Sequence, residues 1–158
     1  MEESVSMEEN NLLPMDAQVE MWKQTLGVKE VDAANMSPLT LAFIGDAVYE
    51  MAVRTIFVSR GSTSVEKLNR MCSHFAKAPT QALIANRIMD SLTEKEQGVF
   101  RRGRNAKAMT KAKNATIIDY RIATGFEALI GYLYLSQQFD RMIEVISNGL
   151  KCAGIDTF

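Results

Sequence analysis

The sequence predicts an all-α domain, a bundle of helices, and three observations lead to that prediction. Hydrophobic residues make up 47% of the 158 residues, and most of them recur three or four positions apart, the spacing of a buried helix face. Only three prolines and nine glycines interrupt the chain. No segment alternates apolar and polar residues convincingly, so we expect no strands.

The beginning of the chain differs in charge from the rest. Residues 1–35 carry eight acidic and two basic side chains, whereas residues 36–158 carry eleven acidic and sixteen basic ones, a net charge of +5 that the overall −1 conceals. We expect a disordered acidic arm over residues 1–14. Residues 15–158 suit a single domain that begins with a short helix, Met15–Leu26. The basic balance of that domain permits an anionic partner.

The first long apolar helix is predicted over Leu39–Val58. Ser37 suits the N-cap, and Pro38 suits the first helical position, where no backbone donor is needed. Apolar residues recur along this helix at helical spacing, so we expect it to have a broad buried face. The residues expected on that face are Leu39, Phe43, Ile44, Ala47, Val48, Met51 and Ala52.

Two residues in the middle of this helix are unusual for an apolar helix. Asp46 is a carboxylate in apolar surroundings, where the charged form is costly unless it is paired, hydrogen-bonded or bound to a metal. Gly45 lowers helix stability by up to ~1 kcal/mol relative to alanine. A residue without a side chain lets another backbone or a substrate come close, which indicates a point of close approach at Gly45.

A second helix of the same kind is predicted over Ile117–Gln137, with Glu127 in its middle. Gly125 and Gly131 flank that glutamate, and each is a place where two helices can pack closely. If the two helices meet in the core, Asp46 and Glu127 repel one another unless a hard cation lies between them, and Mg²⁺ takes oxygen ligands of this kind. The alternative is that both carboxylates point to solvent, and composition leaves both arrangements open.

Shorter helices are expected between and after these two. Thr93 suits the N-cap of one of them, a charged helix that we expect to face solvent. The last helix should bury Met142, Ile143, Ile146 and Leu150. The expected segments are a helix from Val65 to about Phe75, then Thr80–Leu92, Glu94 to about Arg102, and Phe139–Ala153.

A strongly basic segment, residues 101–113, leads into the helix that carries Glu127. Between Glu96 and Asp119 the sequence has no acidic residue. Such a run is usually a solvated loop, but its position beside the predicted carboxylate pair favours contacts with phosphodiesters. Asn105 is small enough to bind a 2′-hydroxyl or to shape the turn. The predicted RNA-binding residues are Arg101, Arg102, Arg104, Asn105, Lys107, Lys111 and Lys113.

Three sequence segments are informative beyond the helical spacing of their apolar residues. They are LAFIGDAVYE, RRGRNAKA followed by KN, and RIATGFEALIGYLYL. Together they resemble mini-ribonuclease III, a family of small bacterial relatives of the ribonuclease III catalytic domain. The first string resembles the signature around the catalytic aspartate, and the third resembles the helix that supplies the catalytic glutamate. The second is particular to the mini branch. The resemblance runs in order from about Pro38 to Leu135.

The resemblance implies a ribonuclease III-like helical domain that acts as a homodimer on double-stranded RNA. It implies that Asp46 and Glu127 are the catalytic, metal-binding residues, with Mg²⁺ as the cofactor and Mn²⁺ as a substitute. A metal-activated water would leave 5′-phosphate and 3′-hydroxyl ends. The RNA would be recognised by its backbone shape. The resemblance further implies a cytoplasmic role in maturing the precursor of the large-subunit (23S) ribosomal RNA.

The chain departs from the larger ribonucleases III in two respects. Those enzymes have acidic residues where this chain has Leu39, Ala42 and Thr124, so we expect one firmly held Mg²⁺ rather than a stable pair. Glu50, one turn after Asp46, is expected in a surface ion pair rather than in the metal site. We expect no double-stranded-RNA-binding domain after the last helix, and we therefore expect RNA affinity to be modest and to fall steeply with salt.

Two other functions stay open on the sequence. One is a catalytically silent RNA-binding scaffold of the same fold, against which the presence of both Asp46 and Glu127 argues. The other is a helical, metal-dependent phosphohydrolase for small nucleotides, against which the absence of a His–Asp cluster argues. The chain has two cysteines and a single histidine, which make neither a disulfide framework nor a zinc site. No apolar run reaches the ~18 residues that cross a bilayer, so no membrane partner is expected.

Overall fold

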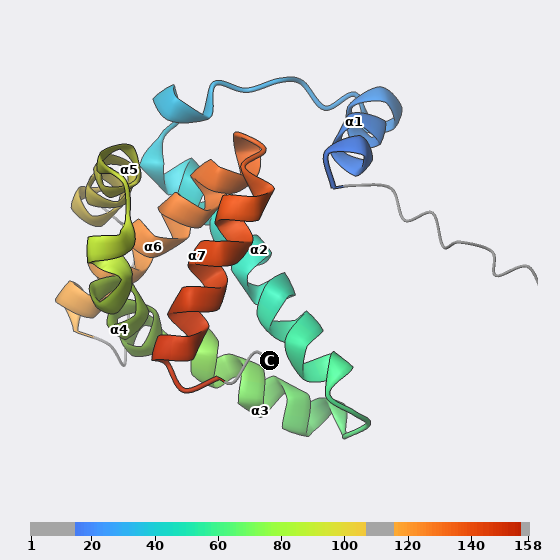
Figure 1. Cartoon of the computed structure of the whole chain (residues 1–158), viewed down its shortest axis with the longest axis vertical. Coiled ribbons are helices and arrows are strands. Elements are labelled where there is room, and N and C mark those ends of the chain that lie inside the picture. Colours follow the sequence, from blue (N-terminus) through green and yellow to red (C-terminus); the bar gives the residue numbers. More distant parts are fainter. Residues whose placement is uncertain (1–14, 107–115, 156–158) are drawn as a thin grey trace, which may run out of the picture. The chain divides into compact units, whose positions relative to one another are not determined.

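The structure is a computed structural model that describes residues 15–106 and 116–155, and it confirms the predicted all-α class (Figure 1). Within those residues it contains seven α-helices, two short 3₁₀ helices and no strand. The predicted acidic arm over residues 1–14 lies outside the described residues. Packing divides the chain into two compact units, residues 1–30 and residues 31–158.

The first unit contains helix α1, Met15–Leu26, which has the predicted bounds. Gly27 follows it with a φ of 66°, a conformation that glycine adopts without strain. The Nζ atom of Lys23 lies 3.1 Å from a carboxylate oxygen of Glu30. This contact ties the segment after α1 to the last turn of the helix.

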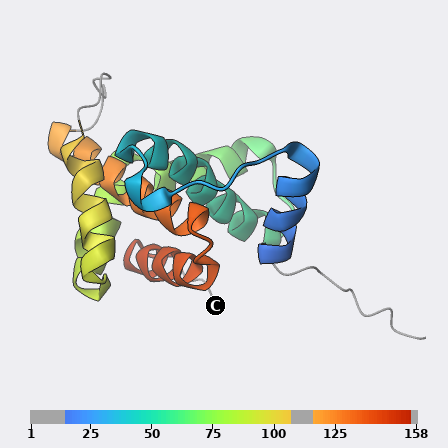
Figure 2. The ribbon, with the colours of Figure 1, turned by 90° about the horizontal axis from the view of Figure 1, so that it is seen from above.

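Helix α6, Ile117–Leu135, is the centre of the second unit. Four helices pack against it, and a fifth, α3 (Val65–Ala76), packs against two of those four, α2 and α4. Figure 2 shows α6 between α2 and α7. Because α6 is surrounded on most sides, nearly all of its residues from Ala123 to Leu133 are buried. The four helices are α2 (Pro38–Ser59), α4 (Ala78–Ile88), α5 (Glu94–Asn105) and α7 (Phe139–Cys152).

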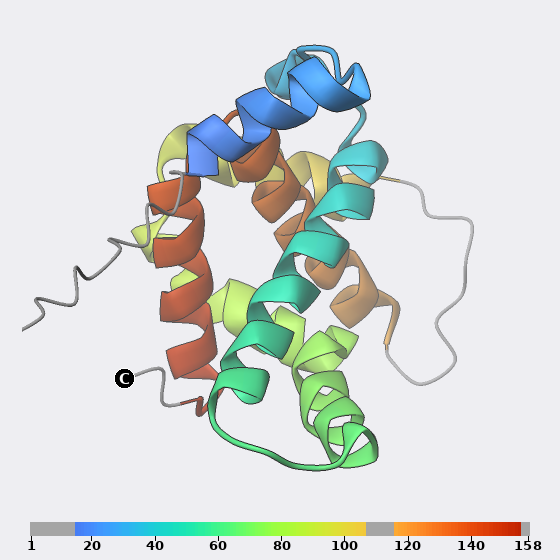
Figure 3. The ribbon, with the colours of Figure 1, turned by 90° about the vertical axis from the view of Figure 1, so that its right-hand side faces the viewer.

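The predicted close approach of the two long helices is confirmed, and Figure 3 shows α2 crossing α6. A Cβ atom added to Gly45 would overlap the carbonyl oxygen of Glu127, and one added to Gly131 would overlap the carbonyl oxygen of Leu41. The two backbones are therefore in direct contact, which any side chain at either glycine would prevent. Gly125 makes a similar contact with α5, because its Cβ would lie 2.7 Å from the carbonyl oxygen of Phe100.

The predicted buried face of α2 is wrong in part. Val48 is buried, but Leu39, Phe43, Ala47 and Met51 are exposed. The sequence pattern failed here because α2 is apolar on nearly all sides, and periodicity alone does not say which side meets the core. The glycine contact with α6 selects the other side, whose buried residues are Leu41, Ala42, Gly45, Val48, Tyr49 and Val53.

The prediction that the helix after Thr93 faces solvent is also wrong. Helix α5 runs three residues past Arg102 to Asn105, and it packs against α6 with Val99, Phe100 and Gly103 buried. The basic segment predicted as a loop over residues 101–113 is therefore helical at its start. The N-cap assignment is confirmed, since the Thr93 hydroxyl accepts from the Glu96 N–H and the Glu96 carboxylate accepts from the Thr93 N–H.

Smaller corrections concern α4 and α7. Helix α4 begins at Ala78 rather than at Thr80, because Pro79 fits within the first turn, where a backbone donor is not needed. It ends at Ile88, and the short 3₁₀ helix Met89–Ser91 follows. In α7 the sequence predicted that Ile143 is buried, but Ile143 is 55% exposed and Val145 is buried instead.

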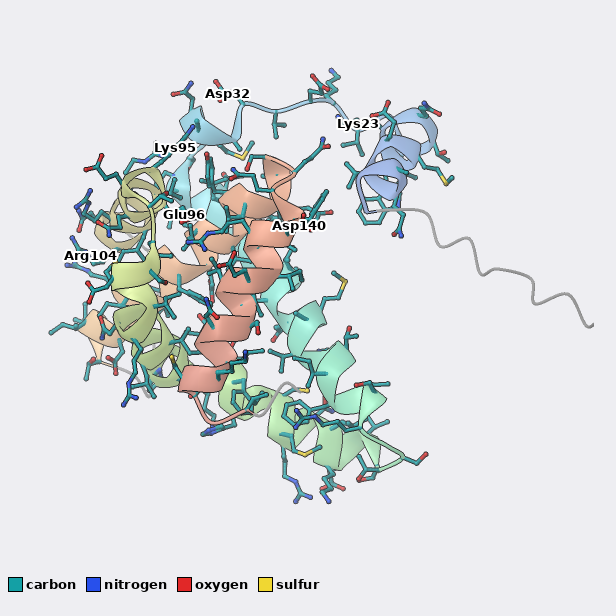
Figure 4. All side chains as sticks on the ribbon, viewed as in Figure 1. Lys23, Asp32, Lys95, Glu96, Arg104 and Asp140 are labelled. Carbon is teal, nitrogen blue, oxygen red and sulfur yellow. The ribbon has the colours of Figure 1, made fainter. Side chains whose placement is uncertain are left out.

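An ion pair joins the start of α5 to α7. Glu96 is 4% exposed, and Arg141 donates to both of its carboxylate oxygens, over 2.8 and 2.9 Å. Arg141 also donates to the carbonyl oxygen of Ser91. Figure 4 shows Glu96 among the side chains between these helices. The pKa of Glu96 is lowered, chiefly by the hydrogen bonds from Arg141. No helix within the described residues is long and apolar enough to cross a membrane.

Candidate active site

Asp46 lies midway along α2 and is exposed to solvent. The preceding residue, Gly45, sits against the backbone of Glu127, so the contact between the helices brings Asp46 to the level of Glu127 on α6. The pKa of Asp46 is raised, first by partial burial and then by the negative charge of Glu50.

Glu127 is the more buried of the two carboxylates. Burial is the largest influence on it, and the charge of Asp46 acts in the same direction, so the pKa of Glu127 rises to about 8. Glu50 adds a smaller contribution of the same sign, whereas the amide of Gln81 opposes them by favouring the ionised form. Asp46 and Glu127 therefore share one electrostatic environment. The sequence left open whether the two carboxylates meet or point to solvent. The coupling indicates that they lie near one another, although Asp46 is also exposed to solvent.

This arrangement favours a divalent cation. A cation beside Asp46 and Glu127 would remove their mutual repulsion and offset the cost of ionising a half-buried glutamate. Two carboxylates suit Mg²⁺, which keeps several waters and takes few protein ligands. Across residues 15–106 and 116–155 there is no group of three or more His, Cys, Asp or Glu side chains that could hold a metal ion. A site here would therefore rest on two protein carboxylates together with water and substrate.

Glu50 follows Asp46 by one turn of α2 and is half-buried. Its carboxylate lies 3.9 Å from the Arg54 guanidinium, the surface ion pair expected for it. Even so, its charge reaches both Asp46 and Glu127 and raises the pKa of each. Glu50 thus contributes to the negative potential of the site without belonging to the pair.

Tyr49 fixes α2 beside the pair. Its ring is fully buried and stands edge-on to the ring of Phe126, with 5.4 Å between the ring centroids. Its hydroxyl donates to the carbonyl oxygen of Phe75 over 2.8 Å, which joins α2 to α3. Since Asp46 and Glu127 each lie within a turn of one of these two rings, this packing holds the helices that carry them in register.

Three positions at which larger ribonucleases III carry acidic residues hold none here. Leu39 is partly exposed at the start of α2, and Ala42 is buried on the side facing the core. Thr124, one turn before Glu127, is buried, and its hydroxyl donates to the carbonyl oxygen of Tyr120 within α6. None of these three side chains is a carboxylate, so the expectation of one firmly held Mg²⁺ stays a prediction.

The structure places part of the predicted RNA-binding set. Arg101, Arg102, Arg104 and Asn105 occupy the last turns of α5, whereas Lys107, Lys111 and Lys113 lie outside the described residues. Arg102 donates to the carbonyl oxygen of Ala34 over 3.0 Å, so it also has a structural role. Arg104 stacks near the Phe100 ring, 5.9 Å from its centroid, and lies at the edge of the view in Figure 4. Arg101 is exposed.

Gln81 is the residue near the site that sequence reasoning missed. It lies on α4, is 0% exposed, and its amide is close enough to Glu127 to influence its ionisation. A lone glutamine among Ala82, Ile84 and Ala85 gives no sequence signal that distinguishes it from a surface residue.

Comparison with known proteins identifies the class. A model of the ribonuclease III domain family matches residues 39–138, a range that contains Asp46 and Glu127 as well as the basic end of α5. The chain belongs to the ribonuclease III family and is an endoribonuclease, that is, a hydrolase. The family acts on double-stranded RNA.

Individual relatives confirm the resemblance to mini-ribonuclease III. The chain is 49% identical over 116 residues to the Mini-ribonuclease 3 of Clostridium tetani, a match that covers 73% of this chain and 77% of that protein. It is 44% identical over 125 residues to the Mini-ribonuclease 3 of Enterococcus faecalis, covering 78% and 95% of the two chains. A crystal structure of a Fusobacterium nucleatum protein has a TM-score of 0.66 and 29% identity, and covers 74% of this chain and 93% of its own.

Proposed function

We propose that this protein hydrolyses phosphodiester bonds of double-stranded RNA with the help of Mg²⁺, which Asp46 and Glu127 bind. The observation that carries the proposal is the meeting of these carboxylates across the glycine contact of α2 and α6, where burial and mutual repulsion raise the pKa of Glu127 to about 8. Such a pair is costly to ionise in the protein alone. A divalent cation, which the family generally uses, would offset the free-energy cost of ionising the pair.

The chemistry follows from what the carboxylates can hold. A metal ion held by these carboxylates would supply an activated water and would stabilise the charge that develops on the phosphate. Asp46 and Glu127 act as oxygen donors, and Glu127 gives up its proton to do so. In the reaction, the oxygen of water bonds to phosphorus and the bond from phosphorus to the 3′ oxygen breaks, so a 5′-phosphate and a 3′-hydroxyl remain. Mn²⁺ prefers the same oxygen ligands and should substitute.

The basic end of α5 supports contact with the RNA backbone. Arg101 and Arg104 lie there, and the chain continues through Lys107, Lys111 and Lys113 towards the helix of Glu127. Arginine and lysine side chains of this kind bind phosphates and set position without reading bases. We expect A-form duplex RNA to be bound by its shape, with an affinity that falls steeply as salt rises.

An apolar stripe on α2 supports a homodimer. Its exposed side chains include Leu39, Phe43, Met51 and Val58, and Phe43 is 81% exposed. These residues recur along one side of the helix opposite the core, the pattern of a helix that lies against a second surface. A second copy of the chain would cover the stripe with its own, because a two-fold interface is self-complementary.

The biological role is the one that the sequence resemblance implies. We propose that the protein acts in the cytoplasm on the precursor of the large-subunit (23S) ribosomal RNA. A dimer with one active site in each copy could cut both strands of a duplex stem in that precursor.

The test of this function is cleavage of a perfect RNA duplex in Mg²⁺ by the wild type beside Asp46→Asn. We expect the wild type to cut both strands and the variant, which keeps the shape of the side chain, to cut neither. Labelled ends show whether the products carry 5′-phosphates. Binding without cleavage across several duplexes and both Mg²⁺ and Mn²⁺ would instead indicate an RNA-binding scaffold. Cleavage by Asp46→Asn at the wild-type rate would refute the assigned site.

The dimer has a separate test. Replacing Phe43 by serine removes the most exposed large side chain of the stripe while leaving the core untouched. We expect sedimentation to show a dimer for the wild type and a monomer for Phe43→Ser at the same concentration. A monomeric wild type would refute the homodimer and would indicate that the stripe binds a different partner.

A further inference from the structure

Gln81 lacks the hydrogen bonds that a buried amide normally has. Its side chain is 0% exposed, and neither Nε2 nor Oε1 has a hydrogen-bond partner within the described residues. Burying an amide without partners destabilises a fold, so such groups are rare in native structures and call for a reason.

The other buried polar side chains make the contrast clear. Among the described residues, Glu96 and Thr124 are the two further polar side chains classed as buried. Glu96 is bound by Arg141, and the Thr124 hydroxyl donates to the carbonyl oxygen of Tyr120. Gln81 alone among the three has both of its polar atoms unmatched. An apolar side chain of the same length would fill this place on α4 without that cost.

The neighbour of this amide is the Glu127 carboxyl group. Helix α4 packs against α6, and the Gln81 amide lies close enough to Glu127 to favour its ionised form, although the two do not have the geometry of a full hydrogen bond. A hydrogen bond between them would run from Nε2 to a carboxylate oxygen, because an ionised carboxylate only accepts. That bond is stronger when Glu127 carries its negative charge, because a hydrogen bond to a charged acceptor is stronger than one to a neutral group.

We propose that Gln81 is a positioning residue that donates to one oxygen of the Glu127 carboxylate and holds the other oxygen towards the metal ion. This inference rests on the proposed role of Glu127 in metal binding. Groups that hydrogen-bond a metal-binding carboxylate fix its orientation, and removing them commonly lowers metal affinity by about 10- to 100-fold. The missing partner of the Gln81 amide is, on this account, a carboxylate that turns towards it when the metal binds.

Metal binding without RNA is the direct test, with Mn²⁺ as the probe because free Mn²⁺ is measured by electron paramagnetic resonance. We expect Gln81→Met to weaken Mn²⁺ binding by about 10-fold. We also expect its Tm without metal to equal or exceed that of the wild type, since an unmatched buried amide is replaced by an apolar chain of similar length. Gln81→Leu, with the same expected result, serves if the methionine variant does not fold.

Gln97→Met is the matched control, because it makes the same chemical change on α5. The Gln97 amide donates to the carbonyl oxygens of Met89 and Leu92, so this variant should lose Tm and keep its Mn²⁺ affinity. The two glutamines should thus respond in opposite ways. Lower Tm with unchanged Mn²⁺ affinity in both Gln81→Met and Gln81→Leu would overturn the proposal and make Gln81 a purely structural residue.

Glu127→Gln separates this inference from the proposed function. If Glu127→Gln and the wild type have the same Mn²⁺ affinity, or if neither protein binds Mn²⁺, the proposed metal site is refuted. The proposed role of Gln81 is then refuted as well. If Glu127→Gln loses Mn²⁺ and Gln81→Met does not, only the role of Gln81 is refuted. If both lose affinity, the double variant should bind no more weakly than Glu127→Gln alone, because the amide then has no carboxylate to orient.

Discussion

Glu96 and Glu127 are both glutamates on helices that pack into the same core, and they have opposite electrostatic surroundings. Arg141 and Thr93 donate to Glu96, and its pKa is lowered. Burial and the negative charge of Asp46 raise the pKa of Glu127 to about 8. The protein satisfies the buried Glu96 carboxylate with its own groups, whereas under the proposed function the half-buried Glu127 is satisfied by a bound cation. On that proposal, Glu96 is a structural acid and Glu127 a functional one.

The largest expected effect comes from Glu127→Gln. Losing a metal-binding carboxylate should reduce duplex cleavage by about 1,000-fold or more, because metal assistance contributes several kcal/mol to the transition state. The same change should leave the Tm of the metal-free protein equal or higher, since it removes a repulsion with Asp46. Single-turnover cleavage and thermal unfolding measure the two quantities. A variant that loses cleavage because it unfolds would weaken the comparison.

Arg141→Met should show the opposite pattern. It leaves the 4% exposed Glu96 without its cation, and breaking a buried pair in this way should lower the free energy of unfolding by about 3 kcal/mol. Cleavage per folded molecule should not change, because this pair lies at the junction of α5 and α7. Urea unfolding at neutral pH gives the free energy. A loss of cleavage without a loss of stability would place Arg141 in the function.

The two glutamates should also respond differently to pH. The pKa of Glu127 is higher in the folded protein than its ordinary value of 4.5, so its contribution favours folding at low pH and is lost as pH rises through about 8. Glu96 has a lowered pKa, so its contribution is present above its ordinary value of 4.5 and is lost as pH falls.

Mg²⁺ should therefore raise the Tm of the wild type more at pH 8 than at pH 6, because at the higher pH fewer protons compete for Glu127. Differential scanning fluorimetry with and without Mg²⁺ at the two pH values measures this. Glu127→Gln is the control and should show little Mg²⁺ effect at either pH. Equal shifts in wild type and variant would mean that the ion acts elsewhere.

The smallest expected effect is that of Glu50→Gln. Glu50 raises the pKa of both Asp46 and Glu127 through its charge, while its own partner is the exposed Arg54. Removing it should move the rising limb of the pH–rate profile to lower pH by less than about half a unit, because charges near the surface interact weakly. Cleavage should otherwise persist. A loss as large as that of Glu127→Gln would make Glu50 a third member of the site.

The frame of the site could be read from the sequence. Both long helices and the close approach at Gly45 and Gly131 follow from glycines and carboxylates placed inside apolar helices, whereas the sequence left open whether Asp46 and Glu127 meet. These features are local, since a glycine that weakens a helix and a charge in an apolar run are visible wherever they occur. The resemblance to mini-ribonuclease III added the chemistry.

What the sequence could not show depends on residues far apart in the chain. Arg141 binds Glu96 across 45 positions, and no local pattern predicts that pair. The sequence pattern places most of the exposed stripe of α2 in the core, because the helix is apolar on both sides. Gln81 carries no signal until α4 is seen against α6. In each case packing, rather than composition, decides the role of the side chain.

The most direct test of the central claim is to follow the side-chain carboxyl signals of Glu127 and Glu96 by carbon NMR across pH, without metal and in saturating Mg²⁺. We predict that Glu127 titrates near pH 8 without metal and at much lower pH with Mg²⁺, while Glu96 titrates below 4.5 in both. If Glu127 titrates near 4.5 without metal, or if Mg²⁺ leaves its pKa unchanged, the account of Glu127 as the unsatisfied, metal-binding carboxylate is wrong.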